Sequence, residues 1–205
     1  MTRGHQTLRN YHGTMLLAPE HAALLEVEED LGQPVSSFEA SGGHVTRLDL
    51  SCNLKALHFS LPASLGNLSS LQALGLLNNL SASLPDSIGN LHSLQLLNLQ
   101  SNRLAALPET VGAMASLEEL LLVKNQLTSL PDTIGNLRTL QILDLLENPL
   151  VALPETITQL SSLQVLTGIN LVLTETLERW INDNGIMTHR VADNSEAHWK
   201  RWRME

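Results

Sequence analysis

The sequence predicts an α/β solenoid in which short coils of chain stack side by side around one shared core. Three observations support this fold class. A motif recurs at a constant interval, apolar residues within each interval alternate as they do in a β-strand, and the 205 residues suit a single domain. Since 43% of the residues are hydrophobic, the chain is able to bury a continuous core.

The repeat has an interval of 23 residues. The pattern Leu-Pro-x-x-aliphatic-Gly begins at four positions, with a variant at a fifth: Leu61, Leu84, Leu107, Leu130 and Leu153. A second pattern, Leu-x-x-Leu-x-Leu, opens at the same interval: Leu71, Leu94, Leu117, Leu140 and Leu163. Because two separate patterns share one interval, each interval is expected to form one structural unit of a repeat protein.

The second pattern describes a short strand. Side chains alternate between the two faces of a strand, so Leu97 and Leu99 are expected to point into the solenoid and Asn98 away from it. One coil is unable to close its own core, and stacking therefore buries the leucines of adjacent coils against each other. At roughly 25 cal/mol per Å², this burial is the main term that offsets the chain entropy lost on folding.

These positions resemble the leucine-rich-repeat family. The clearest unit has its characteristic residues at Leu94, Leu97, Leu99, Asn102, Leu104 and Leu107-Pro108. The resemblance covers roughly residues 45–171 and is to the intracellular class with Leu-Pro-x-x-Ile-Gly-x-Leu-x-x-Leu, which includes Ras-suppressor-like, plant Ras-group-related and prokaryotic members. It implies a right-handed β-α superhelix with parallel strands on the concave face and short helical or 3-10 turns on the convex face.

The turns of the repeat carry polar and small residues at fixed offsets. In the family, asparagines that follow the strand form a ladder bonded to backbone groups of adjacent coils, which the resemblance implies for Asn102, Asn125 and Asn148. Prolines followed by acidic residues are expected to begin the convex-side turns: Pro85-Asp86, Pro108-Glu109, Pro131-Asp132 and Pro154-Glu155. Three glycines permit either close packing or a tight exit: Gly89, Gly112 and Gly135.

The first two repeats depart from the pattern. Val45 opens the first unit and lies 26 residues before Leu71, with the extra residues near 57–60. In both units a leucine directly follows the asparagine, in the pairs Asn53-Leu54 and Asn79-Leu80. Either the asparagine step or the leucine step is therefore displaced by one residue, which makes Cys52 and Asn78 candidates for the ladder position.

Atypical sequence at both ends predicts caps, which cover the terminal core of a solenoid. Residues 1–44 are expected to form an N-terminal extension, with a capping helix over 19–31. About six repeats are expected over residues 45–171, followed by a C-terminal cap and tail over residues 172–205. No element is predicted before about residue 15. At the other end, Gly168 replaces a core leucine, a helix is expected after the N-cap Thr174 with Gly185 as its stop, and a closing strand is expected over 186–191.

Charge and cysteine content disfavour several kinds of partner. The net charge of −9 and the pI of about 5.3 oppose binding to nucleic acid or anionic lipid. Cys52 is the only cysteine, which rules out an intramolecular disulfide and fits a reducing compartment. The N-terminal residues do not form the apolar segment of a secretory signal, and no stretch is apolar enough to span a bilayer, so a cytoplasmic protein without membrane insertion is expected.

The sequence contains no enzyme signature. Eight histidines are scattered, and no pair has a metal-ligand spacing: His5, His12, His21, His44, His58, His92, His189 and His198. Neither a Gly-x-Ser-x-Gly nucleophile motif nor a Gly-x-x-x-x-Gly-Lys phosphate loop occurs. The chain is therefore expected to be non-enzymatic and to hold neither cofactor nor metal ion.

The outward positions of the strands form the candidate partner-binding site, because the family binds partners on the concave face. These positions are Arg47, Asp49, Leu77, Leu96, Asn98, Gln100, Glu119, Leu121, Val123, Ile142, Asp144, Leu146, Val165 and Thr167. The central apolar members are expected to form an exposed patch: Leu96, Leu121, Val123, Ile142 and Leu146. Contiguous exposed apolar area marks an interaction surface, although the same residues also suit a strand, or a face covered by a cap or a second copy.

These features predict a non-enzymatic adaptor or scaffold that binds a protein through its concave face. The resemblance to Ras-related members makes a small-GTPase signalling component a candidate partner. The alternative is a structural subunit or self-associating component of a larger assembly, and a monomer is favoured. The tail over 198–203 mixes Trp199 and Trp202 with basic residues, a composition that suits an acidic or aromatic partner or a membrane surface. Packing of Trp199 or Trp202 over the final coil, with the charges left in water, is the favoured prediction.

Overall fold

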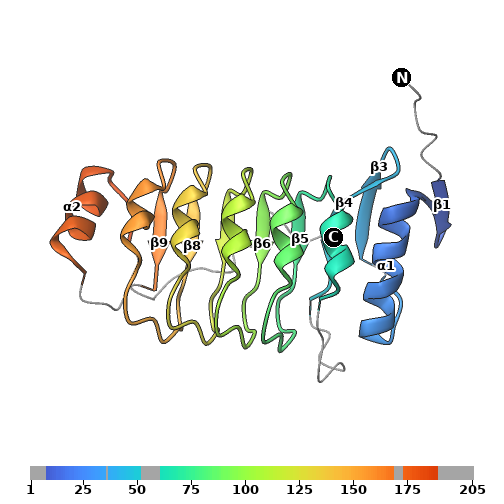
Figure 1. Ribbon diagram of the computed structural model, residues 1–205, viewed down its shortest axis with the longest axis horizontal. Coiled ribbons are helices and arrows are strands. Elements are labelled where there is room, and N and C mark those ends of the chain that lie inside the picture. The colour runs from blue at the N-terminus through green and yellow to red at the C-terminus, as the bar shows by residue number, and fades with distance from the viewer. Residues whose placement is uncertain (1–7, 36, 52–60, 169–172, 189–205) are drawn as a thin grey trace.

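The computed structural model describes residues 8–35, 37–51, 61–168 and 173–188 and forms an elongated solenoid (Figure 1). Six parallel strands, one per coil, make its main sheet: β4 (His44–Asp49), β5 (Ala73–Gly75), β6 (Leu96–Asn98), β7 (Glu119–Leu121), β8 (Ile142–Asp144) and β9 (Val165–Thr167). An added strand, β3 (Phe38–Ser41), pairs antiparallel with β4 at the N-terminal edge. The predicted α/β solenoid is confirmed.

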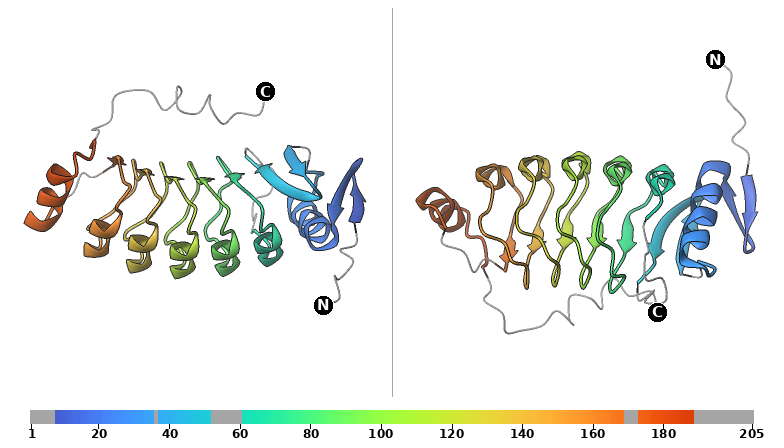
Figure 2. Two further views of the ribbon diagram at one scale, coloured as in Figure 1. Left: turned by 90° about the horizontal axis from the view of Figure 1, so that it is seen from above. Right: turned by 60° about the horizontal axis from the view of Figure 1, so that its bottom comes forward.

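The side opposite the strands carries one short 3-10 helix per coil (Figure 2). These helices are η1 (Ala63–Asn67), η2 (Asp86–Asn90), η3 (Glu109–Ala113), η4 (Asp132–Asn136) and η5 (Glu155–Gln159). A proline occupies the N-cap of each, with φ between −70° and −67°, because its ring already fixes the dihedral that the turn requires. From η2 onwards an acidic residue lies in the first turn, as the sequence predicted.

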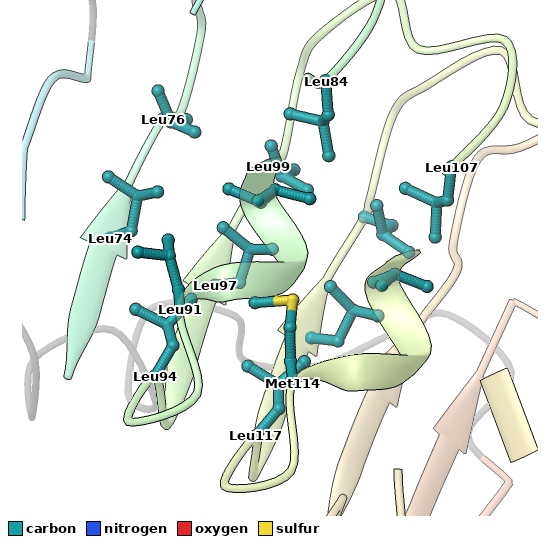
Figure 3. Close-up of a cluster of buried hydrophobic side chains, with 14 of the residues drawn as sticks. Leu74, Leu76, Leu84, Leu91, Leu94, Leu97, Leu99, Leu107, Met114 and Leu117 are labelled. Carbon is teal, nitrogen blue, oxygen red and sulfur yellow. The ribbon is translucent and has the colours of Figure 1, made fainter. Parts of the chain in front are cut away.

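Leucines from adjacent coils fill the space between strands and helices (Figure 3). Leu97 and Leu99 of one coil and Leu120 and Leu122 of the next are 0% exposed, as the alternation of the strand predicted. Met114, which follows η3, is equally buried and fills the place where neighbouring coils have leucine. The core therefore runs through the whole stack as one cluster.

The glycines of the convex turns allow the coils to approach closely. An added Cβ at Gly112 would lie 2.4 Å from the carbonyl oxygen of Thr133 in the next coil. Gly89 and Gly135 meet Thr110 and Thr156 in the same way, and none of these three glycines has a positive φ. Of the two predicted roles, close packing is therefore confirmed and a tight exit is wrong.

The predicted asparagine ladder joins the coils through backbone groups. Each Nδ2 donates to a carbonyl oxygen of the preceding coil, from Asn102 to Leu76 at 2.8 Å and from Asn125 to Leu99 at 2.9 Å. Asn148 continues the ladder with a bond to the carbonyl of Leu122 at 2.9 Å. The ladder satisfies carbonyls that the end of each strand would otherwise leave unpaired in the interior.

The structure decides which step is displaced in the second repeat. Asn79 occupies the ladder position, where its Nδ2 donates to the carbonyl of Leu50 at 2.8 Å, so the proposed role of Asn78 is wrong. The leucine step is the displaced one, because Ser81 is buried at the usual leucine offset and Leu80 adopts a left-handed backbone with φ of 56°. The corresponding residues of the first repeat, Cys52 among them, lie outside the described residues.

The N-terminal cap contains the predicted helix, α1 (Ala18–Leu31), which ends at Gly32 with φ of 64°. No element was predicted before residue 15, and this is corrected by a hairpin of β1 (Leu8–Tyr11) and β2 (Thr14–Leu17). Its turn is His12-Gly13, two positive-φ residues of the kind that a tight hairpin requires. The carboxylate of Glu20, 2% exposed, ties α1 to β4 by accepting hydrogen bonds from the backbone N–H of Val45 and the ring of His44.

The C-terminal cap contains α2 (Glu175–Asp183), whose predicted N-cap is confirmed. The hydroxyl of Thr174 accepts a hydrogen bond from the backbone N–H of Leu177 at 3.3 Å, and Leu177 itself is buried. In place of the predicted strand over 186–191, the described part shows a single parallel bridge between Met187 and Val165. Residues 189–191 lie outside the described residues.

Candidate protein-binding face

The strand registers align the outward side chains in rows across the sheet. The first row contains Arg47, Ala73, Leu96, Glu119, Ile142 and Val165, and the second contains Asp49, Gly75, Asn98, Leu121, Asp144 and Thr167. A third row lies just after the strands and contains Ser51, Leu77, Gln100, Val123 and Leu146. Backbone hydrogen bonds between adjacent coils continue there, for example from the N–H of Ser101 to the carbonyl oxygen of Val123. We call these three rows together the concave face.

The middle of the concave face is an apolar cluster of Ala73, Leu96, Leu121 and Ile142. Ala73 was not among the predicted site residues, because alanine at one offset carries no signal of its own. The predicted exposed patch needs correction, since Leu96 and Leu121 are only 5% and 3% exposed. Parallel strands about 4.8 Å apart bring side chains of one row into lateral contact, so each shields its neighbours. We call these four residues the central apolar cluster.

Half-buried side chains around this cluster supply the accessible apolar area. Val123, Ile142 and Leu146 keep part of their surface open to solvent, as does Leu77 in the third row. The outward apolar positions therefore comprise a packed centre, against which the half-buried Ile142 lies, and further half-buried apolar side chains in the third row. Such a feature suits a partner that adds to an existing apolar layer.

Polar residues of the second row are held by their own turns. The carboxylate of Asp49 accepts a hydrogen bond from the N–H of Ser51 at 2.9 Å, and the amide oxygen of Asn98 accepts one from the N–H of Gln100 at 3.1 Å. The carboxylate of Asp144 repeats the arrangement with Leu146 at 3.3 Å. Thr167 adds a hydroxyl that donates to Asp144. These bonds orient the side chains and leave further acceptor capacity on each carboxylate.

The concave face has an excess of negative charge. Its rows carry three carboxylates, those of Asp49, Asp144 and Glu119, of which Glu119 is only 7% exposed, against one guanidinium, that of Arg47. The Nε atom of Arg47 lies 3.8 Å from the carboxylate of Glu39 on β3, which balances part of its charge. The face therefore favours a partner that brings positive charge next to apolar side chains.

Histidines within the described residues have structural contacts. The rings of His12 and His44 pair with Glu28 and Glu20 at 3.1 Å and 2.7 Å, and His92 lies 3.1 Å from the carbonyl oxygen of Ala113. In the described ranges, no group of three or more histidine, cysteine or acidic residues is arranged to hold a metal ion. No helix of this part of the chain is both long and apolar enough to cross a membrane.

The aligned rows, the convex 3-10 turns and the asparagine ladder define a repeat solenoid with one open strand face. The family model for the Leucine Rich Repeat matches residues 116–137, which include the whole of β7 and of η4. Together with the solved structures below, this identifies the chain as a leucine-rich-repeat protein. No curated protein matches the sequence.

Three solved structures illustrate the similarity. A leucine-rich-repeat protein of Leptospira interrogans is 30% identical with a TM-score of 0.53, over 83% of this chain and 57% of its own. The repeat ectodomain of the receptor kinase SOBIR1 from Arabidopsis thaliana is 26% identical with a TM-score of 0.59, over 73% and 90%. A plant ice-binding protein shares the fold at 22% identity and a TM-score of 0.64, over 77% and 59%. The chain thus spans less than two thirds of the Leptospira and ice-binding proteins.

Proposed function

We propose that this chain is a non-enzymatic adaptor or scaffold that binds a partner protein on its concave face. The observation that carries the proposal is the central apolar cluster, which lies outside the continuous core of the stack and is bordered by accessible apolar side chains. The leucine-rich-repeat fold is commonly a protein-interaction module. The outward rows are the part of this fold that varies from coil to coil, and recognition depends on such variable surface.

The chemistry of the face describes the partner. An apolar anchor that packs on Ile142, Val123 and Leu146 would gain most of the binding free energy, because a few central residues dominate most interfaces. Basic groups beside that anchor would meet the half-buried carboxylate of Asp144, which favours rapid and specific association. A partner segment with an apolar centre and a basic border fits both features.

Affinity capture from matched cell extract tests the proposal. The bait is the wild-type chain, compared with the double variant Leu121→Arg/Leu146→Arg, and folding of each is checked by circular dichroism. Val151→Arg is the matched control, because Val151 is 78% exposed and lies away from the three rows. Partners retained by wild type and Val151→Arg but lost by the double variant support the proposal. Identical recovery by all three proteins contradicts it.

Because Leu121 is almost fully buried, a milder variant keeps the test valid if the double variant unfolds. Ile142→Arg changes a half-buried side chain at the border of the cluster and is expected to lose the same partners. Size-exclusion chromatography with light scattering on the same proteins addresses the alternative role in self-association. A monomer supports an adaptor, whereas a dimer that Ile142→Arg dissociates supports a self-associating subunit.

The cellular setting is part of the same proposal. A lone cysteine supports a reducing compartment, so we place the protein in the cytoplasm. The resemblance to Ras-related members supports a role in signal transduction, with a small-GTPase signalling component as partner. Mass spectrometry of the captured proteins tests this identity directly, and recovery of an unrelated class of partner contradicts it.

A further inference from the structure

We propose that the chain carries its own ligand for the concave face, namely the C-terminal tail, residues 189–205. In this proposal the tail binds the face within the same molecule and competes there with the partner. The inference rests on the proposed use of the concave face as a binding surface.

The described chain ends at the edge of the sheet that forms the concave face. Met187 lies parallel to β9, where its N–H donates to the carbonyl of Gln164 at 2.8 Å and its carbonyl accepts from the N–H of Leu166 at 3.0 Å. Thr188 is the last described residue. The tail therefore starts next to the last strand of the face, rather than on the convex side.

The tail is long enough to reach the middle of the face. Seventeen residues follow Thr188, and an extended chain spans about 3.3 Å per residue, or about 55 Å in all. Neighbouring strands lie about 4.8 Å apart, which puts β7 about 10 Å and β6 about 14 Å from β9. The segment 198–203 can therefore lie over the central apolar cluster without being stretched, and closing a loop of this length costs little.

The segment 198–203 complements the face in both polarity and charge. Its two indoles, those of Trp199 and Trp202, offer large flat apolar surfaces to Ile142 and its half-buried neighbours. It also carries three cations and no acidic residue: Lys200, Arg201 and Arg203. Guanidinium groups pair with carboxylates in a bidentate manner, and the second row places the half-buried Asp144 carboxylate next to Leu121, beside the apolar cluster.

The convex side offers no comparable surface. It carries acidic residues such as Glu109 and Asp132, but its apolar residues Val111 and Ile134 are 0% exposed. A tail with two tryptophans would find charge there without apolar contact. Among the described residues α1 also combines the two, with Leu25 45% exposed beside Glu26 and Glu29, but this helix lies at the opposite end of the stack from β9, where the tail starts (Figure 1).

Binding of a labelled peptide tests whether the tail is a ligand. A fluorescent peptide of residues 189–205 is titrated into the full chain and into the variant Trp199→Ala/Arg201→Glu/Trp202→Ala. Because a tethered tail acts at an effective concentration near millimolar, the peptide should bind the tail variant more than about tenfold tighter than wild type. Equal affinity for both proteins, or no binding to the tail variant, would overturn the proposal.

Variants of the face locate the bound peptide. In the tail-variant background, Ile142→Arg should weaken peptide binding by at least about tenfold, since it adds a charge that repels the basic peptide, whereas Val151→Arg should leave it unchanged. Asp144→Asn keeps the shape of the face and should weaken binding by a smaller factor. Peptide binding that none of the face variants alters would place the tail elsewhere and overturn the proposal.

A spin label distinguishes binding within one molecule from binding between two copies. In the full chain with Cys52→Ser and Met204→Cys, a nitroxide at position 204 should broaden the methyl signals of Ile142 and Val123 more than those of Ile134 on the convex side. The effect should not change on dilution. Broadening that disappears on dilution would show exchange between copies and contradict the intramolecular site.

The two proposals fail separately. If the peptide does not bind while wild type still captures partners that the double variant loses, the tail proposal fails and the proposed function stands. If the peptide binds and no partner is captured even by the tail variant, the proposed function fails and the tail proposal stands. Stronger partner capture by the tail variant than by wild type is expected when both are correct.

Discussion

The central coils and the two caps are stabilised in different ways. In the coils every contact recurs, so that Leu97 packs as Leu120 does and Asn102 bonds as Asn125 does. In the caps each contact occurs once, as with the buried carboxylate of Glu20, which joins α1 to β4 through two hydrogen bonds. Repeated contacts leave a periodic trace in the sequence, whereas unique ones do not. The comparison also predicts where a single substitution does most damage.

Removal of a core leucine should cost most in the central coils. We expect Leu97→Ala to lower the free energy of unfolding by about 4 kcal/mol and Leu177→Ala in α2 by about 2 kcal/mol, since Leu97 packs between two coils and Leu177 against the last one only. Urea denaturation followed by circular dichroism measures both. An equal loss in the two variants would contradict the difference between coil and cap.

A methyl group added between coils should cost next most. Gly112→Ala places its Cβ against the carbonyl oxygen of Thr133, and this overpacking should lower stability by about 2 kcal/mol. Gly185→Ala meets no atom within 4 Å, and its cost of about 1 kcal/mol arises only from its φ of 61°. If differential scanning calorimetry shows Gly112→Ala to be neutral, the close approach of the coils is not required for stability.

Loss of a hydrogen-bonding side chain should also destabilise the protein more in a central coil than in the C-terminal cap. Asn125→Ala leaves the N–H of Leu104 without its side-chain acceptor and removes one of the two hydrogen bonds to the buried carbonyl of Leu99, which should cost about 2 kcal/mol. Thr174→Ala removes one N-cap at the exposed start of α2 and should cost about 1 kcal/mol. Chemical denaturation of the two single variants provides the test, and a larger loss for Thr174→Ala would reverse the comparison.

The smallest expected effect concerns the cap and pH. Burial raises the pKa of Glu28, but hydrogen bonds from Tyr11, the Val35 N–H and His12 outweigh it and lower the pKa below its ordinary value. A lowered pKa in the folded state stabilises the protein above the unfolded-state pKa, and this contribution is lost as pH falls through the folded pKa. Glu28→Gln should therefore lose less stability than wild type between about pH 5 and about pH 3.

An exposed carboxylate provides the control for this pH experiment. Glu109→Gln, at the first turn of η3, should follow the wild-type dependence on pH. Thermal unfolding in a series of buffers measures all three proteins. Parallel curves for wild type and Glu28→Gln would show that the hydrogen bonds to Glu28 do not stabilise the cap.

The sequence predicted the coils well, because each core position is repeated several times. It predicted neither the hairpin of β1 and β2 nor the contacts of Glu20, since these join residues far apart in the chain without any period. It also missed the left-handed residue that follows each of the strands β5 to β8 by three positions, because Asn78, Ser101, Lys124 and Glu147 share that backbone but no side-chain chemistry. A backbone conformation that residues of different types share produces no motif in the sequence.

The candidate site was predicted in position but not in degree of burial. Offsets along the repeat placed the side chains in the correct rows, because strand register follows from the period. The exposure of Leu96 and Leu121 depends on lateral packing between coils, which a single repeat does not encode. Whether these rows bind a partner stays a prediction.

The central claim is that the inward side chains hold the fold while the outward ones are available for recognition. Strand β8 tests it most directly, because Leu143 is 0% exposed and points inward, whereas its neighbour Ile142 points outward and is half-buried. Urea unfolding should show Leu143→Ala to be less stable than wild type by about 3 kcal/mol and Ile142→Ala by less than about 1 kcal/mol. Equal losses would mean that the outward row is part of the structural core, and would contradict this account.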